Sequence, residues 1–207
     1  MFRNILRPDS PLMITMTQIT DCIFLSLFWL LGCFPVVTAG VSTAALYDAV
    51  YHGFRKGEKH SWQRFFHAFR QNLKPGIVPS VLFLAAAAVL VRMGILVWNQ
   101  AVYGNLSWGV FAAAAFFLLV LLGIGSITFP LLSRFETGTV QLFSNTFRLG
   151  FAKLPLTLGL ALVNAAVIFL CVRYIVPVFF LPALGALLST LFIEPMLRPY
   201  MPRDDEA

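Results

Sequence analysis

The chain has 207 residues, of which 59% are hydrophobic and 12% are charged, and its mean hydropathy is +0.82. This composition excludes an ordinary soluble domain, in which about a quarter of the residues are charged. Since about 20 apolar residues cross a bilayer core, the length allows roughly five or six spans and no separate soluble domain. We therefore expect a single all-α membrane domain over residues 1–207.

The gaps between charged residues locate the expected spans. The longest gap, between Arg92 and Arg134, is too long for one crossing and contains the turn sequence Tyr103-Gly104-Asn105, which indicates a helical hairpin. The other gaps complete a polytopic transmembrane helical bundle of six spans. These spans are expected at about 12–36, 40–56, 76–100, 107–132, 154–174 and 177–195.

The distribution of Lys and Arg gives the orientation, because basic residues of short loops stay in the cytoplasm. The loop after the second expected span carries six basic residues and one acidic residue, which places it inside. Six spans then leave 13 of the 15 basic residues and both termini in the cytoplasm, whereas five spans leave 11. Because the second span would have only about 17 residues, close to the lower limit for crossing a bilayer, five spans remain the alternative.

Two segments, Ser61–Lys74 and Thr139–Lys153, combine basic and aromatic residues at helical spacing. They predict two cytoplasmic interfacial amphipathic helices, with rings at the acyl boundary and cations toward the headgroups. Nucleic acid is not expected as a partner despite a pI of about 9.6, because anionic lipid explains basic residues that lie beside aromatic ones. The cations expected to contact anionic headgroups or a partner are Arg55, Lys56, Lys59, Arg64, Arg70, Lys74 and Arg148.

The same two segments share a sequence pattern at a constant offset. The pattern consists of Gln63, Phe65, Phe69 and Arg70, repeated as Gln141, Phe143, Phe147 and Arg148. It predicts a weak parallel repeat of residues 12–75 and 76–153, followed by a helical hairpin at 154–195. Chance matching in a chain rich in Phe is the alternative.

Pro35, Thr38 and Gly40 predict a helix-turn motif between the first two spans. Pro35 would end the first helix, Gly40 would permit a tight reversal, and Ser42 or Thr43 would cap the second helix. Small residues then recur every fourth position, which lets helices approach closely and predicts that the second span lies at the centre of the bundle. These small residues are Gly40, Ala44, Ala45, Ala49 and Gly53.

Intramembrane charges are the best candidates for a functional polar site, because each is costly in a bilayer unless it is paired or hydrated. Asp48 and Arg92 each lie about 12 Å from the outer end of their expected helices, and we expect them to pair. The pair would be either a structural ion pair or part of a hydrated path. Asp21 is expected near the cytoplasmic interface, hydrated or bonded to a neighbouring threonine, and Glu194 is expected as a solvated helix end.

Residues 27–47, LFWLLGCFPVVTAGVSTAALY, resemble the start of the YesL-like family of bacterial integral membrane proteins, domain of unknown function 624. The basic residues 55–58 and the aromatic segment 62–74 are similar as well, and the likeness is clear as far as Lys74. The resemblance implies a bacterial cytoplasmic membrane protein whose relatives are frequently encoded near carbohydrate ABC importers. It implies no catalytic residues.

No catalytic motif, metal-ligand spacing or cofactor motif is recognisable in the sequence, so an enzyme is not expected and no cofactor is expected. The favoured hypothesis is a non-catalytic accessory or regulatory component associated with carbohydrate uptake, with ABC importer subunits as partners. The alternative is a small transporter or channel, assembled as a homo-oligomer, that uses Asp48 and Arg92 in a hydrated path.

Overall fold

The computed structural model describes residues 11–58, 60–102, 108–134, 138–174 and 176–197, and the regular elements in these ranges are all helical. The all-α prediction is therefore confirmed. In chain order the elements are α1 (Pro11–Cys33), α2 (Ala39–Val50), the π-helix η2 (Tyr51–Arg55), α3 (Ser61–Val102), α4 (Trp108–Arg134), α5 (Thr139–Ala152), α6 (Leu154–Arg173), the 3₁₀ helix η3 (Val176–Phe179) and α7 (Leu181–Leu197).

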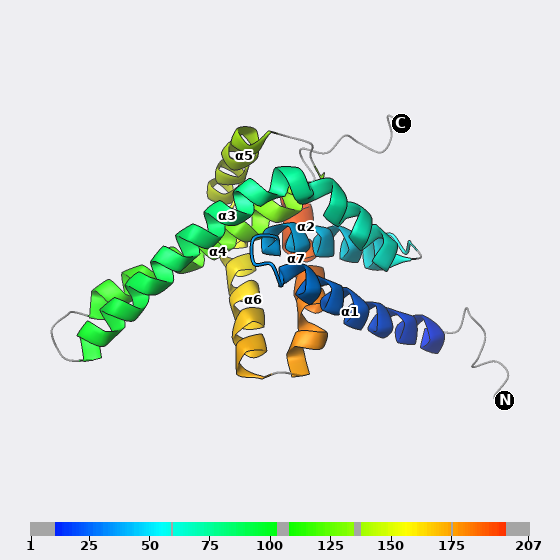
Figure 1. Ribbon diagram of the computed structural model, residues 1–207, viewed down its shortest axis with the longest axis horizontal. Helices are drawn as coiled ribbons and strands as arrows, with labels where there is room; N and C mark the ends of the chain where they lie inside the picture. The colour runs from blue at the N-terminus through cyan, green and yellow to red at the C-terminus, as the bar shows by residue number, and fades with distance from the viewer. Residues whose placement is uncertain (1–10, 59, 103–107, 135–137, 175, 198–207) are drawn as a thin grey trace.

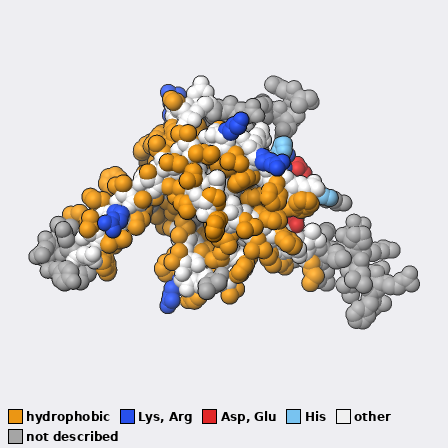
Figure 2. All heavy atoms as spheres, viewed as in Figure 1, with side chains coloured by type: hydrophobic (Ala, Val, Ile, Leu, Met, Phe, Trp, Pro, Cys, Tyr) orange, Lys and Arg blue, Asp and Glu red, His pale blue; other side chains and the backbone are white. Residues whose placement is uncertain are grey.

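Three helical arms diverge from a common centre (Figure 1). One arm is α1, the second is the distal part of α3 with α4, and the third is α6 with α7. The short helix α2 lies where the arms meet. Hydrophobic side chains cover most of the visible surface of the arms (Figure 2), which is the surface expected of helices that face lipid.

Among the residues that the structure describes, four helices are long and apolar enough to cross a membrane, through the stretches Met16–Cys33, Ser61–Asn99, Gly109–Arg134 and Leu154–Arg173. Apolar side chains on these arms face outward; Val89 and Phe117, for example, are 62% and 61% exposed. These features fit a helical membrane protein. Since α7 has 17 residues and α2 has 12, the six-span arrangement and its five-span alternative remain predictions.

Helix α2 forms the centre of the molecule, and ten of its twelve residues are buried. Its small residues permit this burial, as predicted. A Cβ on Gly40 would overlap the side chains of Phe129 in α4 and Ser80 in α3, and a Cβ on Gly53 in η2 would overlap Ser61. The backbone of α2 thus lies directly against its neighbours, which a larger side chain would prevent.

The reversal between α1 and α2 takes place through residues 34–38, and α1 ends at Cys33, before Pro35. The predicted role of Gly40 in this reversal is wrong. Val36 adopts the left-handed conformation with φ of 57°, while Gly40 lies inside α2 and serves close packing. Thr38, the N-terminal flanking residue of α2, donates its hydroxyl hydrogen bond to the carbonyl oxygen of Gly32 at 2.6 Å. Pro35, Thr38 and Gly40 therefore form one motif with three separate roles.

The predicted capping of α2 by Ser42 or Thr43 is also wrong, because both hydroxyl groups bind α1 instead. Ser42 Oγ donates to the carbonyl oxygen of Trp29 at 2.9 Å, and Trp29 Nε1 donates to Thr43 Oγ1 at 3.2 Å. Both side chains lie one turn inside α2, on the face that packs against α1. Their hydrogen bonds therefore join the two helices.

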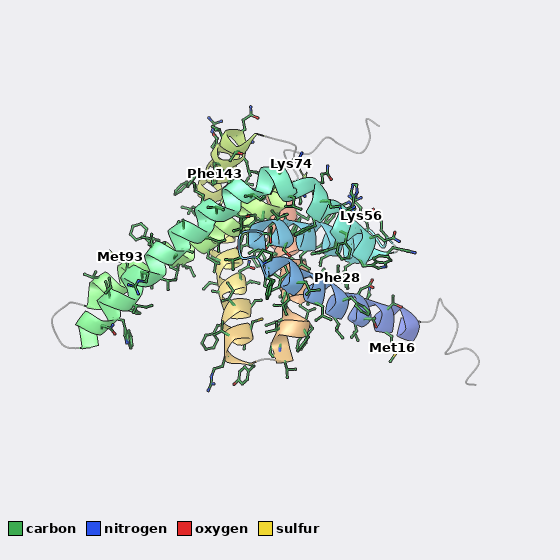
Figure 3. The ribbon with its side chains drawn as sticks, viewed as in Figure 1. Met16, Phe28, Lys56, Lys74, Met93 and Phe143 are labelled. Carbon is green, nitrogen blue, oxygen red and sulfur yellow. The ribbon has the colours of Figure 1, made fainter. Side chains whose placement is uncertain are left out.

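The predicted division into an interfacial helix at 61–74 and a separate span at 76–100 is wrong. Ser61–Val102 is one continuous helix of 42 residues, α3. Pro75 and Pro79 lie inside it, and it bends near Lys74 (Figure 3). Proline removes one helical hydrogen bond and bends a helix without necessarily ending it. Close contact of this region with α2 holds the bend, since a Cβ on Gly76 would lie 2.7 Å from the Val41 side chain.

The remaining core joins α4, α5, α6 and α7 around the inner end of α2. Ile127, Leu142, Leu160 and Ile193 come from these four helices and pack in one buried cluster with Tyr47. The second amphipathic segment is thus a helix, as its pattern predicted, and its buried face completes this core. Its opposite face is exposed and mixed in character: Val140 is 83% exposed, and Gln141, Asn145 and Arg148 are exposed as well.

Gly40→Ala is expected to destabilise the protein, because the added Cβ would overlap Phe129 and Ser80. Overpacking of this kind costs about 1–3 kcal/mol. Gly94→Ala in α3 is the matched control, since its Cβ would meet no atom within 4 Å, and alanine is the better helix former by about 1 kcal/mol. Thermal unfolding of both variants in the same detergent measures the difference. Equal Tm values would contradict the close packing of α2.

Candidate functional site

The most buried carboxylate of the described chain, Asp48, lies in the last turn of α2 and is paired with two basic side chains. Arg64 Nε, from the first turn of α3, donates to Asp48 Oδ2 at 2.8 Å. His52 Nδ1 lies 3.2 Å from Asp48 Oδ1 and 2.9 Å from the Asp48 carbonyl oxygen. The Asp48 side chain is 6% exposed, and a charge this deeply buried requires such partners.

The imidazole of His52 contacts both Asp48 and Arg64. Arg64 Nη2 lies 3.2 Å from His52 Nε2, and a guanidinium group has donors only. His52 Nε2 must therefore accept the hydrogen bond, and the ring proton lies on Nδ1, which faces Asp48. Arg64, His52 and Asp48 are therefore joined to one another by hydrogen bonds and ion-pair contacts.

A second ion pair lies on the other side of α2. Arg134, the last residue of α4, donates from Nη2 to Glu194 Oε1 of α7 at 2.7 Å. The Tyr47 hydroxyl donates to the same oxygen at 3.2 Å. The guanidinium carbon of Arg134 lies 3.8 Å from the centroid of the Tyr51 ring, a cation–π contact. Arg134 and Glu194 are 14% and 22% exposed, so this pair is also shielded from solvent.

The π-helix η2 connects the two ion pairs. The Tyr51 ring stacks on Tyr47 at 6.5 Å and meets the His52 ring edge-on at 5.2 Å. Arg55, the last residue of η2, donates from Nε to Thr190 Oγ1 of α7 at 3.1 Å. A π-helix widens the turn, and such segments are frequent at functional sites. Here η2 directs successive side chains to α3, α4 and α7.

We call this group of side chains the polar network. It consists of Tyr47, Asp48, Tyr51, His52, Arg55, Arg64, Arg134, Thr190 and Glu194. It joins the ends of α2, α3, α4 and α7. Within the described ranges, no group of three or more His, Cys, Asp or Glu side chains is placed to hold a metal ion.

The predicted pair between Asp48 and Arg92 is wrong. Arg92 lies on the same helix as Arg64 but about 42 Å farther along its axis. Figure 3 shows the neighbouring Met93 on the α3–α4 arm, on the opposite side of the molecule from Lys56. The pair was predicted from a helix beginning near residue 76. Because α3 begins at Ser61, its first turn meets Asp48 instead.

The other predicted acidic residues also have specific partners. Asp21 is half-buried and accepts a hydrogen bond from Ser61 Oγ at 3.2 Å, at the N-terminus of α3. Glu194 is not a solvated end, because Arg134 and Tyr47 bind it. The sequence contained a signal for this pair: alternating spans place Arg134 and Glu194 on the same side, at the ends of two apolar helices.

The predicted lipid-contact or partner-contact residues are mostly on the surface. Arg55, Lys56, Arg70, Lys74 and Arg148 are exposed, while Arg64 turns inward to Asp48. Lys59 lies outside the described residues. The exposed cations lie at the end of η2, in the first part of α3 and in α5. Their contact with anionic lipid stays a prediction.

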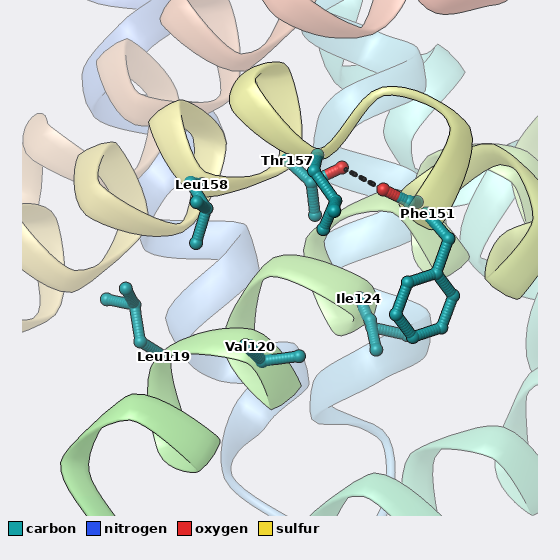
Figure 4. Close-up of a pocket in the computed structure, with 8 residues that line it drawn as sticks. Leu119, Val120, Ile124, Phe151, Thr157 and Leu158 are labelled. Carbon is teal, nitrogen blue, oxygen red and sulfur yellow. Dashed lines mark hydrogen bonds between the residues drawn. The ribbon is translucent and has the colours of Figure 1, made fainter. Parts of the chain in front are cut away.

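A small hollow between α4 and the junction of α5 with α6 is lined by apolar groups (Figure 4). Leu119, Val120 and Ile124 form one wall, and Phe151 and Leu158 lie opposite. Thr157 also lines it, but its hydroxyl donates to the Gly150 carbonyl oxygen at 3.0 Å. The hollow therefore offers little to a polar ligand.

Substitution of Arg64 and substitution of Asp48 are expected to lower the free energy of unfolding by different amounts. Arg64→Gln leaves a buried carboxylate with His52 alone, so we expect a loss of about 3 kcal/mol. Asp48→Asn should cost less, because the Arg64 side chain is 41% exposed and can be hydrated. Chemical unfolding of these two single variants and of the double variant Asp48→Asn with Arg64→Gln gives the coupling energy. The same cycle with Arg92→Gln should give none; coupling to Arg92 would contradict the geometry.

Glu194→Ala is expected to lower the free energy of unfolding by about 3 kcal/mol, because it leaves the buried Arg134 guanidinium without its carboxylate. Tyr47→Phe should cost about 1 kcal/mol through the loss of one hydrogen bond. Glu58→Ala, at an exposed position, is the control and should be neutral. A neutral Glu194→Ala would instead support a solvated helix end.

Comparison with known proteins adds one finding. Residues 22–92 match the model of a family described as "Protein of unknown function, DUF624". The match covers about a third of the chain, from α1 to the distal part of α3, and contains Asp48, His52 and Arg64 but neither Arg134 nor Glu194. No curated protein and no solved structure matches the chain. Over this segment, in which the sequence resemblance was found, the chain is similar to the DUF624 family.

Proposed function

We propose that the protein is a non-catalytic accessory or regulatory component of the bacterial cytoplasmic membrane, associated with carbohydrate uptake. The observation that carries this proposal is that the buried carboxylates form ion pairs between helices. Asp48 and Glu194 each bind a basic side chain of another helix, at 2.8 and 2.7 Å. Such ion pairs fix the relative positions of helices, and buried polar groups of this kind serve packing specificity in some proteins.

The transporter alternative required Asp48 and Arg92 in one hydrated path. Arg92 lies on the α3–α4 arm, far along α3 from Asp48, and Asp48 is occupied by Arg64 and His52. The described hollow is apolar and its lining carries no charged side chain. These contacts favour a structural role for the buried charges over a role in solute movement.

The orientation proposed with this function is six spans with both termini in the cytoplasm. Under it, the polar network and the exposed cations Arg55, Lys56, Arg70, Lys74 and Arg148 lie at the cytoplasmic side, near anionic headgroups. Exposed Trp62 and Phe66 stand among the cations of α3, which suits a membrane interface. The same basic surface would contact a partner subunit.

The association with carbohydrate uptake rests on the resemblance to the YesL-like family, whose members are frequently encoded near carbohydrate ABC importers. The family match over residues 22–92 supports the broader family and leaves this finer assignment as part of the proposal. Importer subunits are accordingly the proposed partners, and a homo-oligomer is the competing assembly.

Purification from native membranes with a C-terminal tag is expected to recover importer subunits in stoichiometric amounts. A variant with Arg55, Lys56, Arg70 and Lys74 changed to Gln should lower this recovery at least fivefold if the basic surface makes the contact. Arg173→Gln, an exposed cation at the opposite end of α6, is the control and should have no effect. Mass spectrometry with isotope-labelled peptides measures the ratio of subunits.

A homogeneous homo-oligomer without importer subunits would contradict the accessory function. In that case, solute uptake by liposomes that contain the purified protein would become the relevant test. An unchanged recovery with the Gln variant would keep the association but move the contact away from the basic surface.

A further inference from the structure

Arg92 is a charge at an unusual place. It lies about 15 Å along the helix from the end of α3 at Val102, within a stretch long and apolar enough to cross a membrane. Its side chain is exposed, and the structure gives it no ion pair or hydrogen bond within the described residues. In Figure 2 a basic group stands among hydrophobic side chains on this arm, and Arg92 is the one Lys or Arg between Lys74 and Arg134.

The surroundings of Arg92 form a continuous outward face of α3. Positions three and four residues apart lie on one side of a helix. Ala85, Ala88, Arg92, Ile95 and Asn99 follow this spacing, and all five are exposed. The face is therefore apolar and smooth toward the centre of the molecule, with a cation and an amide farther out. We call it the Arg92 face.

An unpaired guanidinium group on a lipid-facing helix is costly, and intramembrane cations are normally paired with an acidic group or with backbone carbonyls. Arginines near a helix end can reach the headgroups by snorkelling. Arg92 is almost three helical turns from Val102, which makes this route poor. The charge therefore calls for an anionic group brought by another molecule at the same depth.

A second copy of this chain is a poor source of that anion. The described carboxylates within helices are already engaged: Asp21 by Ser61, Asp48 by Arg64, and Glu194 by Arg134. Glu58 is exposed but precedes α3, whereas Arg92 lies in the distal half of that helix. A protein of different sequence is therefore the better source of an acidic group for Arg92.

We propose that the Arg92 face docks a transmembrane helix of a different protein, and that this helix carries an Asp or Glu that pairs with Arg92. The small side chains of Ala85 and Ala88 let the partner helix come close beside the ion pair. The inference deepens the proposed accessory function, because it places the partner contact inside the membrane and names its chemistry. It rests on that function only for the expectation that the partner is an importer subunit.

The test is site-specific photo-cross-linking in intact cells. A photoreactive amino acid replaces Ile95 on the Arg92 face, which is 49% exposed, or Val172 on α6 as the control, which is 84% exposed on a different arm. We expect a protein adduct from position 95 and none from position 172. The adduct should fall at least tenfold when Arg92→Glu or Arg92→Leu is added. Arg92→Leu removes an exposed intramembrane charge, so it keeps the variant able to fold even where Arg92→Glu is not.

The decisive step is a charge exchange. After the adduct is identified by mass spectrometry, the acidic residue of its cross-linked helix is changed to Arg, and this change should restore the adduct with Arg92→Glu. An adduct that is indifferent to Arg92, an adduct with a second copy of this chain, or a lipid adduct without protein would each overturn the inference. So would a partner whose cross-linked helix has no Asp or Glu.

The two proposals fail in different ways. If importer subunits copurify with the Arg92→Leu variant in wild-type amounts, the inference is wrong and the accessory function stands. If the Arg92-dependent partner is not an importer subunit, the inference stands and the association with carbohydrate uptake is wrong.

Discussion

The burial of the Asp48 carboxylate is the constraint on which the arrangement of the helices depends. Because α2 is packed on nearly all sides, this carboxylate has little access to water and must be compensated within the protein. The first turn of α3 supplies Arg64, and η2 supplies His52 one turn farther along. The chain must therefore turn back immediately after η2, with α3 beginning beside the end of α2. The small residues of α2 permit this approach, and Asp48 makes it specific.

The same end of α2 also determines how the more distant helices are attached. Tyr47 and Tyr51 lie on the side of α2 and η2 away from Arg64, where Arg134 and Glu194 meet. The guanidinium group of Arg134 contacts a carboxylate from α7 and an aromatic face from η2, so its burial depends on both elements. Removing one partner in such a group leaves the others with desolvated charges, which makes the contacts mutually dependent. A group of this kind is well suited to hold a partner-binding surface in one shape.

Helix α3 has two chemically different halves because it serves two different surroundings. Its first turn faces α2 and carries a paired cation, Arg64; its distal part belongs to the exposed arm and carries Arg92. The bend at Pro75 and Pro79 separates the two halves while the helix itself continues. The charges of the core form ion pairs within the chain, whereas Arg92 on the arm has no ion pair among the residues that the structure describes. This contrast is the reason to look for a partner at the arm.

Local properties of the chain were sufficient to predict the helical class, the extent of α4 and α6, and the central place of α2, because apolar length and small-residue spacing can be read along the sequence. They also identified the acidic residues that matter. They did not identify the partners of those residues: Asp48 was assigned to Arg92, and Glu194 to solvent. Pairing depends on where α3 begins and on which helix ends meet, and the sequence predicted a separate helix from about residue 76 where α3 begins at Ser61. Only the tertiary contacts of Val41 and Gly40 with Gly76 and Ser80 show α3 continuing through its prolines. Those contacts, and with them the polar network, depend on packing between segments that lie far apart in the chain.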